Sequence, residues 1–315
     1  MGNKIATREA YGKALVKLSN LNKDVVVLDA DLSKSTKTAD FKAVSPERFI
    51  NMGIAEANMM GVAAGLATCG KVPFASTFAM FAAGRAFEQI RNSICYPELN
   101  VKVCATHAGL TVGEDGATHQ SVEDISLMRS IPNMTVINPA DAVETEAAIL
   151  AVANYNGPCY VRLGRLPVSV INDENNYKFE IGKGVTLANG NDVTIVATGM
   201  MVELALEAKE ALEKDGITAR VINIHTIKPL DNQLLINAAK ETGAIVTAEE
   251  HSIIGGLGSA VSEVVSEECP VPVLKVGIKD TFGESGKPAD LLNKYGLTCE
   301  AIVEKAKKAI SLKNN

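Results

Sequence analysis

The chain has 315 residues, of which 47% are hydrophobic and 22% charged, and its formal net charge is −6. This length exceeds what one ordinary core needs, so we expect two domains of about 150 residues each. The acidic balance, together with the lack of any run of five basic residues, excludes a typical nucleic-acid surface.

Cysteine usage and hydropathy bear on the compartment. The six cysteines show no CxxC spacing and lie mostly in apolar surroundings, which fits reduced, buried thiols. The first 15 residues lack the apolar core of a signal peptide, and no uncharged apolar run reaches 18 residues. We therefore expect a cytoplasmic protein that contacts no membrane and no nucleic acid.

The first predicted elements are a helix and a buried strand. Apolar spacing predicts an amphipathic helix over residues 5–20, with Thr7 as a candidate cap. The run VVVL at residues 25–28 is typical of a strand buried on both faces. Asp29 and Asp31 follow at its carboxyl end, where open α/β sheets bind their ligands, so we expect Asp31 to contact a cofactor.

Residues 51–67, NMGIAEANMMGVAAGLA, predict the start of a buried helix with one charged residue, Glu56. A carboxylate in such surroundings needs a partner that can share a proton or a hydrogen bond. That partner is either a bound ligand or the helix N-terminus itself, and this segment alone leaves both open.

Short apolar strands and helices alternate through the rest of the chain, which predicts a mostly parallel sheet covered on both faces. A strand near residues 71–75 precedes the loop STFAMF and a helix from about Gly84. We expect two three-layer α/β/α domains, the second smaller and Rossmann-like. Their expected bounds are 1–170 and 191–315, joined by a linker over 171–190, and the Asn- and Gly-rich stretch before residue 190 predicts a hairpin.

The loop THAGLTVGEDGATHQ, residues 106–120, combines two histidines, two acidic residues and three glycines. Such a loop can let its backbone approach a ligand and can move protons near neutral pH. A Gly-rich turn without a function is the alternative. His107 and His119 lie twelve residues apart without HxH or HExxH spacing, so we expect no metal site.

The second domain offers weaker signals. GGLGSAV, at residues 255–261, is an incomplete glycine fingerprint, and we interpret it as a closely packed helix N-terminus rather than a nucleotide site. Glu249, Glu250 and His251 are consecutive, so their side chains diverge and form a poor chelate. We expect His225 to be a packed strand-end residue.

Three motifs in this order resemble the C-terminal half of transketolase, in the form where that enzyme is split into two chains. They are GIAEANM, STFAMF and HAGLTVGEDGATHQ, and the resemblance covers nearly the whole chain. It implies that the first domain is a pyrimidine-binding domain for thiamine diphosphate and that the second is the transketolase C-terminal domain.

The resemblance implies a cofactor role for three side chains. Glu56 would hydrogen-bond a ring nitrogen of the aminopyrimidine and promote proton removal from the thiazolium carbon, while Phe78 and Phe81 would pack on the ring. Without the resemblance, the two Phe residues would be assigned to the core. Family members commonly have Tyr at the position of Gly84, where it forms one wall of the pyrimidine pocket. We expect Arg85 to form that wall here.

The resemblance also implies substrate contacts. Glu56, His107 and His119 match catalytic positions, and Asp115 matches a residue that binds a sugar hydroxyl. The positions that match sugar-phosphate ligands are Arg8, Ser35, His107 and Arg162, with Arg165 as the alternative to Arg162 in VRLGRLP. Taken alone, these arginines would be surface residues.

A missing motif predicts a partner. Thiamine diphosphate enzymes hold the diphosphate through a metal bound by a Gly-Asp-Gly motif and a later Asn, and the sequence contains no Gly-Asp-Gly. We therefore expect an N-terminal transketolase subunit to hold Mg²⁺ or Ca²⁺, in a two-by-two heterotetramer. Alone, the chain should be inactive.

The resulting hypothesis is transfer of a two-carbon ketol unit between sugar phosphates. Alternative enzymes are a relative of deoxyxylulose-phosphate synthase, which usually lacks a His at the position of His107, and a 2-oxoacid dehydrogenase β-type subunit, which lacks the GEDGATHQ loop. A catalytically silent scaffold partner is a hypothesis of another class.

Overall fold

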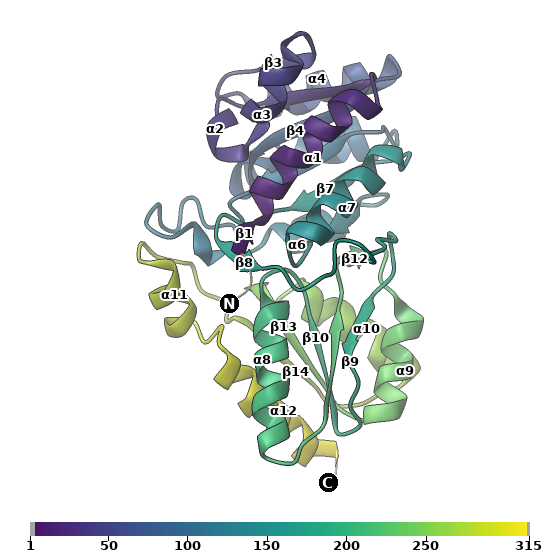
Figure 1. The fold of residues 1–315 in the computed structure, drawn as a ribbon, viewed down its shortest axis with the longest axis vertical. Helices are drawn as coiled ribbons and strands as arrows, with labels where there is room; N and C mark the ends of the chain where they lie inside the picture. The colour runs from purple at the N-terminus through teal and green to yellow at the C-terminus, as the bar shows by residue number, and fades with distance from the viewer. Residues whose placement is uncertain (1–3, 314–315) are drawn as a thin grey trace.

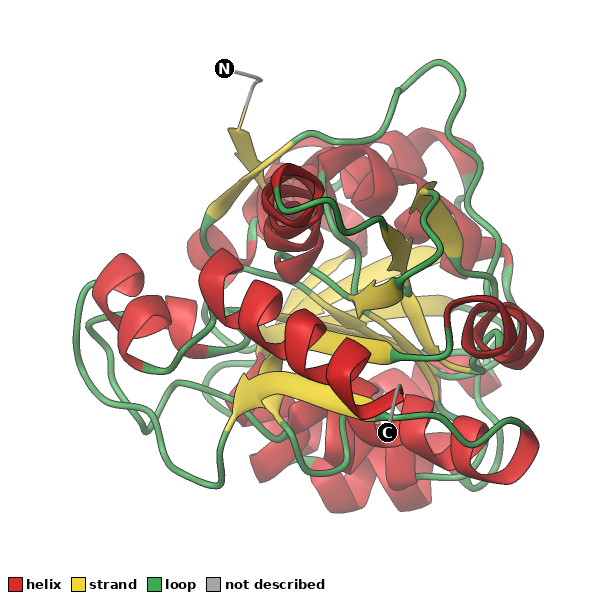
Figure 2. Ribbon diagram, turned by 90° about the horizontal axis from the view of Figure 1, so that it is seen from below, coloured by secondary structure: helices red, strands yellow, loops and turns green. Residues whose placement is uncertain are grey.

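The computed structural model describes residues 4–313, which fold into two α/β units stacked along the long axis of the molecule (Figure 1). Helices flank the strands of both units, as the view from below shows (Figure 2). This arrangement confirms the predicted fold class of two mostly parallel α/β domains.

The first unit is built on a seven-stranded sheet in the order β12-β6-β7-β5-β4-β2-β3. Its pairs are parallel except for the edge pair of β12 and β6. The strands are β2 Val25–Asp29, β3 Phe49–Asn51, β4 Val72–Phe78, β5 Lys102–Thr106, β6 Thr135–Ile137, β7 Cys159–Arg162 and β12 Thr226–Lys228.

Two hydrophobic clusters cover the opposite faces of this sheet. On β2, Val25 and Val27 belong to the cluster that includes α1 and α7, whereas Val26 and Leu28 belong to the cluster that includes α4. Successive side chains of a strand point to opposite faces, so an unbroken apolar run is what a doubly covered strand requires. The helical segments of this unit are α1 Thr7–Leu21, α2 Ser33–Thr36, α3 Thr38–Val44, η1 Pro46–Arg48, α4 Glu56–Thr68, η2 Phe81–Arg85, α5 Phe87–Gln89, η3 Ile90–Cys95, η4 Leu110–Val112, α6 Asp124–Ser130 and α7 Ala142–Asn154.

The second unit has a five-stranded sheet in the order β14-β13-β10-β11-β9, antiparallel only at β9. Its strands are β9 Val185–Ala188, β10 Val193–Ala197, β11 Ala219–Asn223, β13 Ile245–Ser252 and β14 Val273–Ile278. Its helices are α8 Met201–Lys214, α9 Asn232–Thr242, α10 Leu257–Glu268, α11 Pro288–Lys294 and α12 Cys299–Lys313.

The connections between the units differ from the prediction. The stretch before residue 190 forms no hairpin in the described chain, because β8 (Pro167–Ser169) pairs with β1 (Lys4–Ala6) and β9 pairs with β11. The segment predicted to lie wholly in the second unit splits, since β12 extends the first sheet by pairing with β6. The short strands β9 and β12 each add one strand to the edge of a sheet. β9 pairs with β11, and β12 pairs with β6.

Two local predictions have different outcomes. Thr7 does not cap α1: Ala6 is the N-cap, and Thr7 Oγ1 instead accepts a hydrogen bond from the Gly164 amide at 2.7 Å. The Gly-rich segment at residues 255–261 does begin a helix, α10, as interpreted. The amides of Leu257 and Gly258 donate to the Glu249 carboxylate at 2.7 and 2.8 Å, so a side chain of this protein fills the place of an anion.

No helix within residues 4–313 combines the length and the apolar character needed to cross a membrane.

Candidate functional site

A pocket of about 410 Å³ lies at the carboxyl edge of the first sheet. Segments far apart in the sequence meet there: the turn after β2, the start of α4, the segment after β4 and the loop after β5. The lining residues are Ala30, Asp31, Leu32, Ile54, Glu56, Phe81, Arg85, Thr118 and His119. Four of the predicted site residues are among them, at the edge where parallel sheets bind ligands.

Glu56 is the first residue of α4, and it is 1% exposed. Its partner in this structure is Arg85, whose Nη1 donates to both carboxylate oxygens at 2.9 Å each. The helix N-terminus also favours a negative charge there. The ion pair meets the requirement that a buried carboxylate be compensated.

Aromatic rings line the pocket and its inner wall. Phe81 lies on the pocket surface, where the ring of His119 meets it edge-on with centroids 5.3 Å apart. Phe78 is deeper, 7% exposed, and stacks on the imidazole of His107 with centroids 3.9 Å apart. Phe81 therefore offers its ring to a ligand in the pocket, whereas Phe78 supports His107.

His107 is held in a left-handed conformation, with φ of 57°, by the loop that follows β5. Its Nδ1 lies 2.9 Å from Thr106 Oγ1, and its Nε2 lies 3.4 Å from Nη1 of Arg8. Burial lowers the pKa of this imidazole to about 3, and the positive charges of Arg8 and Arg165 act in the same direction. His107 is thus a neutral hydrogen-bonding group at physiological pH.

The predicted phosphate ligands Arg8 and Ser35 are brought together with His107. Arg8 Nη1 donates to the Ser35 backbone carbonyl at 2.8 Å, so the main chain of Ser35, rather than its hydroxyl, makes this contact. Arg8 is partly buried, and its pKa is lowered mainly by that burial. Asp115, in contrast, is exposed. It lies on the same loop as His107 but is not among the residues that line the pocket.

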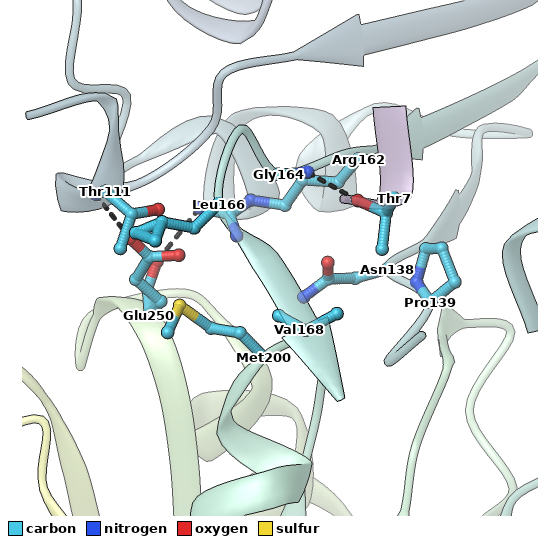
Figure 3. Close-up of a pocket in the computed structure, with 10 residues that line it drawn as sticks. All are labelled: Thr7, Thr111, Asn138, Pro139, Arg162, Gly164, Leu166, Val168, Met200 and Glu250. Atoms are coloured by element: carbon cyan, nitrogen blue, oxygen red, sulfur yellow. Dashed lines mark hydrogen bonds between the residues drawn. The ribbon is translucent and has the colours of Figure 1, made fainter. Parts of the chain in front are cut away.

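Arg162 is not among the residues that line this pocket. It is 3% exposed, its Nε pairs with Asp124 at 2.8 Å, and its Nη2 donates to the Glu250 carbonyl at 2.9 Å. Figure 3 shows Arg162 beside Glu250 at a small cavity of about 20 Å³ between the two units. Its surroundings are those of a buried structural ion pair.

Arg165, the alternative, is better placed. Its side chain is 39% exposed and lies 3.6 Å from the Glu114 carboxylate of the loop that carries both site histidines. Its charge lowers the pKa values of Arg8 and His107, although burial has the larger effect on both. An exposed guanidinium can bind an anion through forked hydrogen bonds, whereas the guanidinium of Arg162 is buried against Asp124 and the Glu250 carbonyl.

The pairing of Arg85 with Glu56 is a contact that sequence reasoning missed, although Arg85 was expected at this wall. A signal for it exists. Residues 72–87 contain one charged residue, Arg85, and residues 51–67 contain one, Glu56. Two opposite charges, each isolated in an apolar segment of the same domain, are expected to pair because neither can be buried alone.

Comparison with known proteins shows the family of this chain. The model of the transketolase pyrimidine binding domain matches residues 3–169, and that of the transketolase C-terminal domain matches residues 182–302. The transketolase C-terminal section of Methanocaldococcus jannaschii is 52% identical over 300 residues, which cover 95% of this chain and 94% of that protein. The transketolase of Mus musculus is 42% identical over 311 residues, which cover 98% of this chain but 49% of that protein.

A solved structure of a split gene transketolase, described as an inactive beta4 tetramer, is similar over 98% of this chain and 99% of that chain, with 61% identity and a TM-score of 0.93. The matched domain models together span most of the sequence, and the resemblance seen in its motifs extends to the whole fold. The chain belongs to the transketolase family, with the pyrimidine-binding and C-terminal domains of that family as its two units.

Proposed function

We propose that this chain is the C-terminal subunit of a two-chain transketolase that transfers a two-carbon ketol unit from a ketose phosphate to an aldose phosphate. The observation that carries the proposal is a buried carboxylate, Glu56, at a pocket with an aromatic wall, at the carboxyl edge of a pyrimidine-binding domain. The family uses thiamine diphosphate and a divalent metal.

The residues of the pocket fit one end of that cofactor. An aminopyrimidine ring needs a flat apolar face and a carboxylate that can share a proton with a ring nitrogen, and Phe81 and Glu56 supply these groups side by side. When bound, the cofactor supplies the carbon nucleophile of the reaction. Glu56 holds a proton at the ring nitrogen, and Phe81 orients the ring against the carboxylate.

The remaining site residues fit an anionic sugar. Arg8 and Arg165 place positive charge beside the neutral imidazole of His107, and a guanidinium makes charge-assisted hydrogen bonds to a phosphate. His119, which lines the pocket beside Phe81, is assigned to the reacting carbonyl. Asp115, exposed in the same loop, is assigned to a sugar hydroxyl, and Asp31 to the cofactor at the pocket rim.

The metal and the diphosphate are assigned to a partner subunit, in a two-by-two heterotetramer. The sequence contains no Gly-Asp-Gly motif, and this chain spans 49% of the length of the mouse enzyme that it matches. The split gene transketolase whose beta4 tetramer is inactive aligns over 99% of its chain with this one. Its inactivity supports the proposal that a second kind of subunit is needed for activity.

The first experiment replaces Glu56 in the complex reconstituted with the N-terminal subunit. Because Glu56→Gln removes the ionisable group at the ring nitrogen, we expect kcat on xylulose 5-phosphate to fall at least about 100-fold. Glu88→Gln, an exposed position on α5, is the matched control and should leave kcat unchanged. Undiminished turnover in Glu56→Gln would instead favour the scaffold hypothesis, and activity on pyruvate alone would favour the related enzymes.

A further inference from the structure

Arg85 makes two contacts inside the pocket. Its Nη1 donates to both oxygens of Glu56 at 2.9 Å, so the donor bridges the carboxylate. Its guanidinium carbon lies 4.5 Å from the centroid of the Phe81 ring, within the range of a cation–π contact. The guanidinium is a planar group with N–H donors, stacked on an aromatic face and bonded to a carboxylate.

These are the same two contacts that the aminopyrimidine ring makes in the function proposed above. A planar ring with an amino group and ring nitrogens would pack on Phe81 and hydrogen-bond Glu56. The guanidinium and the ring cannot both occupy this place, because Arg85 already engages both oxygens of the carboxylate.

We propose that Arg85 is a placeholder for the aminopyrimidine ring, which it replaces in the cofactor-free chain and to which it yields when the ring binds. The proposal rests on the assignment of this pocket to the pyrimidine end of the cofactor. In the free chain, Arg85 compensates the buried charge of Glu56 and holds the carboxylate toward the pocket. On binding, the ring takes over the hydrogen bond to Glu56.

The surroundings of Arg85 allow it to leave. Half of its side chain is exposed, whereas Glu56 is buried, so the guanidinium can turn into solvent while the carboxylate stays in place. Arg85 is the last residue of the π-helical segment η2, which begins at Phe81, and short π-helical segments often occur at functional sites. Gly84, the residue before it, is exposed and adds no side chain that would hold the guanidinium in place.

A placeholder lowers the affinity of the site for its ligand, because the ring must compete with an internal ion pair. An ion pair with one half-exposed partner contributes little free energy, so the competition is weak. We expect the Kd for an aminopyrimidine to differ about fivefold between chains with and without Arg85. A residue that held the ring in place would have the opposite effect when removed.

The test titrates the full chain with 4-amino-2-methylpyrimidine, followed by NMR. We expect Arg85→Gln to bind this probe about fivefold more tightly than the wild-type chain. The matched control is Arg91→Gln, an exposed arginine of η3 that contacts the Asn92 side chain, and it should bind as the wild type does. Equal or weaker binding by Arg85→Gln, or no binding to either form, would overturn the proposal.

A second measurement does not depend on the variant folding. In a crystal structure of the wild-type complex with thiamine diphosphate and Mg²⁺, Arg85 should lie beyond hydrogen-bonding distance of Glu56, and an unbroken ion pair would refute the placeholder. Loss of activity in Glu56→Gln tests the pocket assignment separately. The proposed function can therefore stand when the role given to Arg85 fails.

Discussion

His107 shows how burial and neighbouring charges act together on one side chain. Burial lowers its pKa to about 3, and Arg8 and Arg165 add to the shift. A neutral imidazole stacked on Phe78 can donate one hydrogen bond and accept another, and it keeps both roles across the physiological range.

We therefore expect His107 to stay neutral when the pH is lowered from about 8 to about 5. The check is ¹⁵N NMR of the imidazole side chain in the full chain, assigned with a His107→Gln variant. Replacing Arg8 by Met should raise the titration midpoint, since one of the charges that opposes protonation is gone. A wild-type midpoint near 6.5 would contradict this account.

Replacing the two arginines of VRLGRLP should have different effects: one replacement should raise KM, and the other should lower thermal stability. Arg165→Met should raise the KM for a ketose phosphate about tenfold, because it removes a charge-assisted hydrogen bond to the phosphate, while thermal stability changes little. Arg162→Met should lower the melting temperature instead, since it leaves the buried Asp124 carboxylate unpaired, at a cost of about 3–5 kcal/mol. An Arg162 variant of normal stability with a raised KM would reverse the assignment.

Side-chain chemistry at single positions could be predicted where the residue type was informative. Glu56, alone in an apolar segment, had to have a partner, and the structure provides Arg85. The choice between Arg162 and Arg165 could not be made from spacing. It depends on Asp124 and Glu250, which approach Arg162 only through the packing of α6 and of the second unit.

At the scale of elements, the N-terminus of α7 joins the two units through one carboxylate. The Glu144 amide donates to the side chain of the N-cap Asp141, and Glu144 Oε2 accepts from the amide of Ala140, the residue before the N-cap, at 2.6 Å. The other oxygen accepts hydrogen bonds from Asn223 in β11 and from Tyr177. Complete burial raises the pKa of Glu144 to about 7.

This shift makes stability depend on pH. Between the ordinary value of 4.5 and about 7, the native state holds a proton that the unfolded chain releases. The stabilisation is therefore full below pH 4.5 and falls by roughly 3 kcal/mol as the pH rises through 7.

Urea denaturation of the wild type and Glu144→Gln checks this prediction. The wild type should lose stability relative to Glu144→Gln between about pH 4.5 and pH 8, because the amide cannot ionise. Glu213→Gln, an exposed position on α8, serves as the control. A stability difference that does not change with pH would show that Glu144 is already ionised throughout the range.

Elements with a strong local pattern could be predicted, and those that depend on distant partners could not. The first four residues of β2 are apolar, the whole strand is buried, and it was expected as a strand. Three-residue β12 has no such pattern, and its place follows from the free edge of β6. The helix expected from Gly84 is instead α5 between η2 and η3, because side-chain periodicity does not report the backbone hydrogen-bond register.

At the scale of the whole molecule, the two units share buried contacts that hold the site loop in place. The first hydrophobic cluster continues from the α4 side of the first sheet to residues of α9 and α10 in the second unit. Glu250 of β13 accepts a hydrogen bond from the Thr111 amide at 2.7 Å, within the loop that carries His107 and His119. The C-terminal unit thus supports one wall of a pocket that lies in the other unit.

We propose that this pocket is one half of an active site, and that another subunit supplies the metal and the diphosphate site. The most direct measurement is ketol transfer from xylulose 5-phosphate to ribose 5-phosphate, with thiamine diphosphate and Mg²⁺ present. It compares this chain alone, the N-terminal subunit alone and their equimolar mixture. We expect turnover in the mixture and only background in either subunit alone. Turnover by this chain alone at the rate of the mixture would contradict the account.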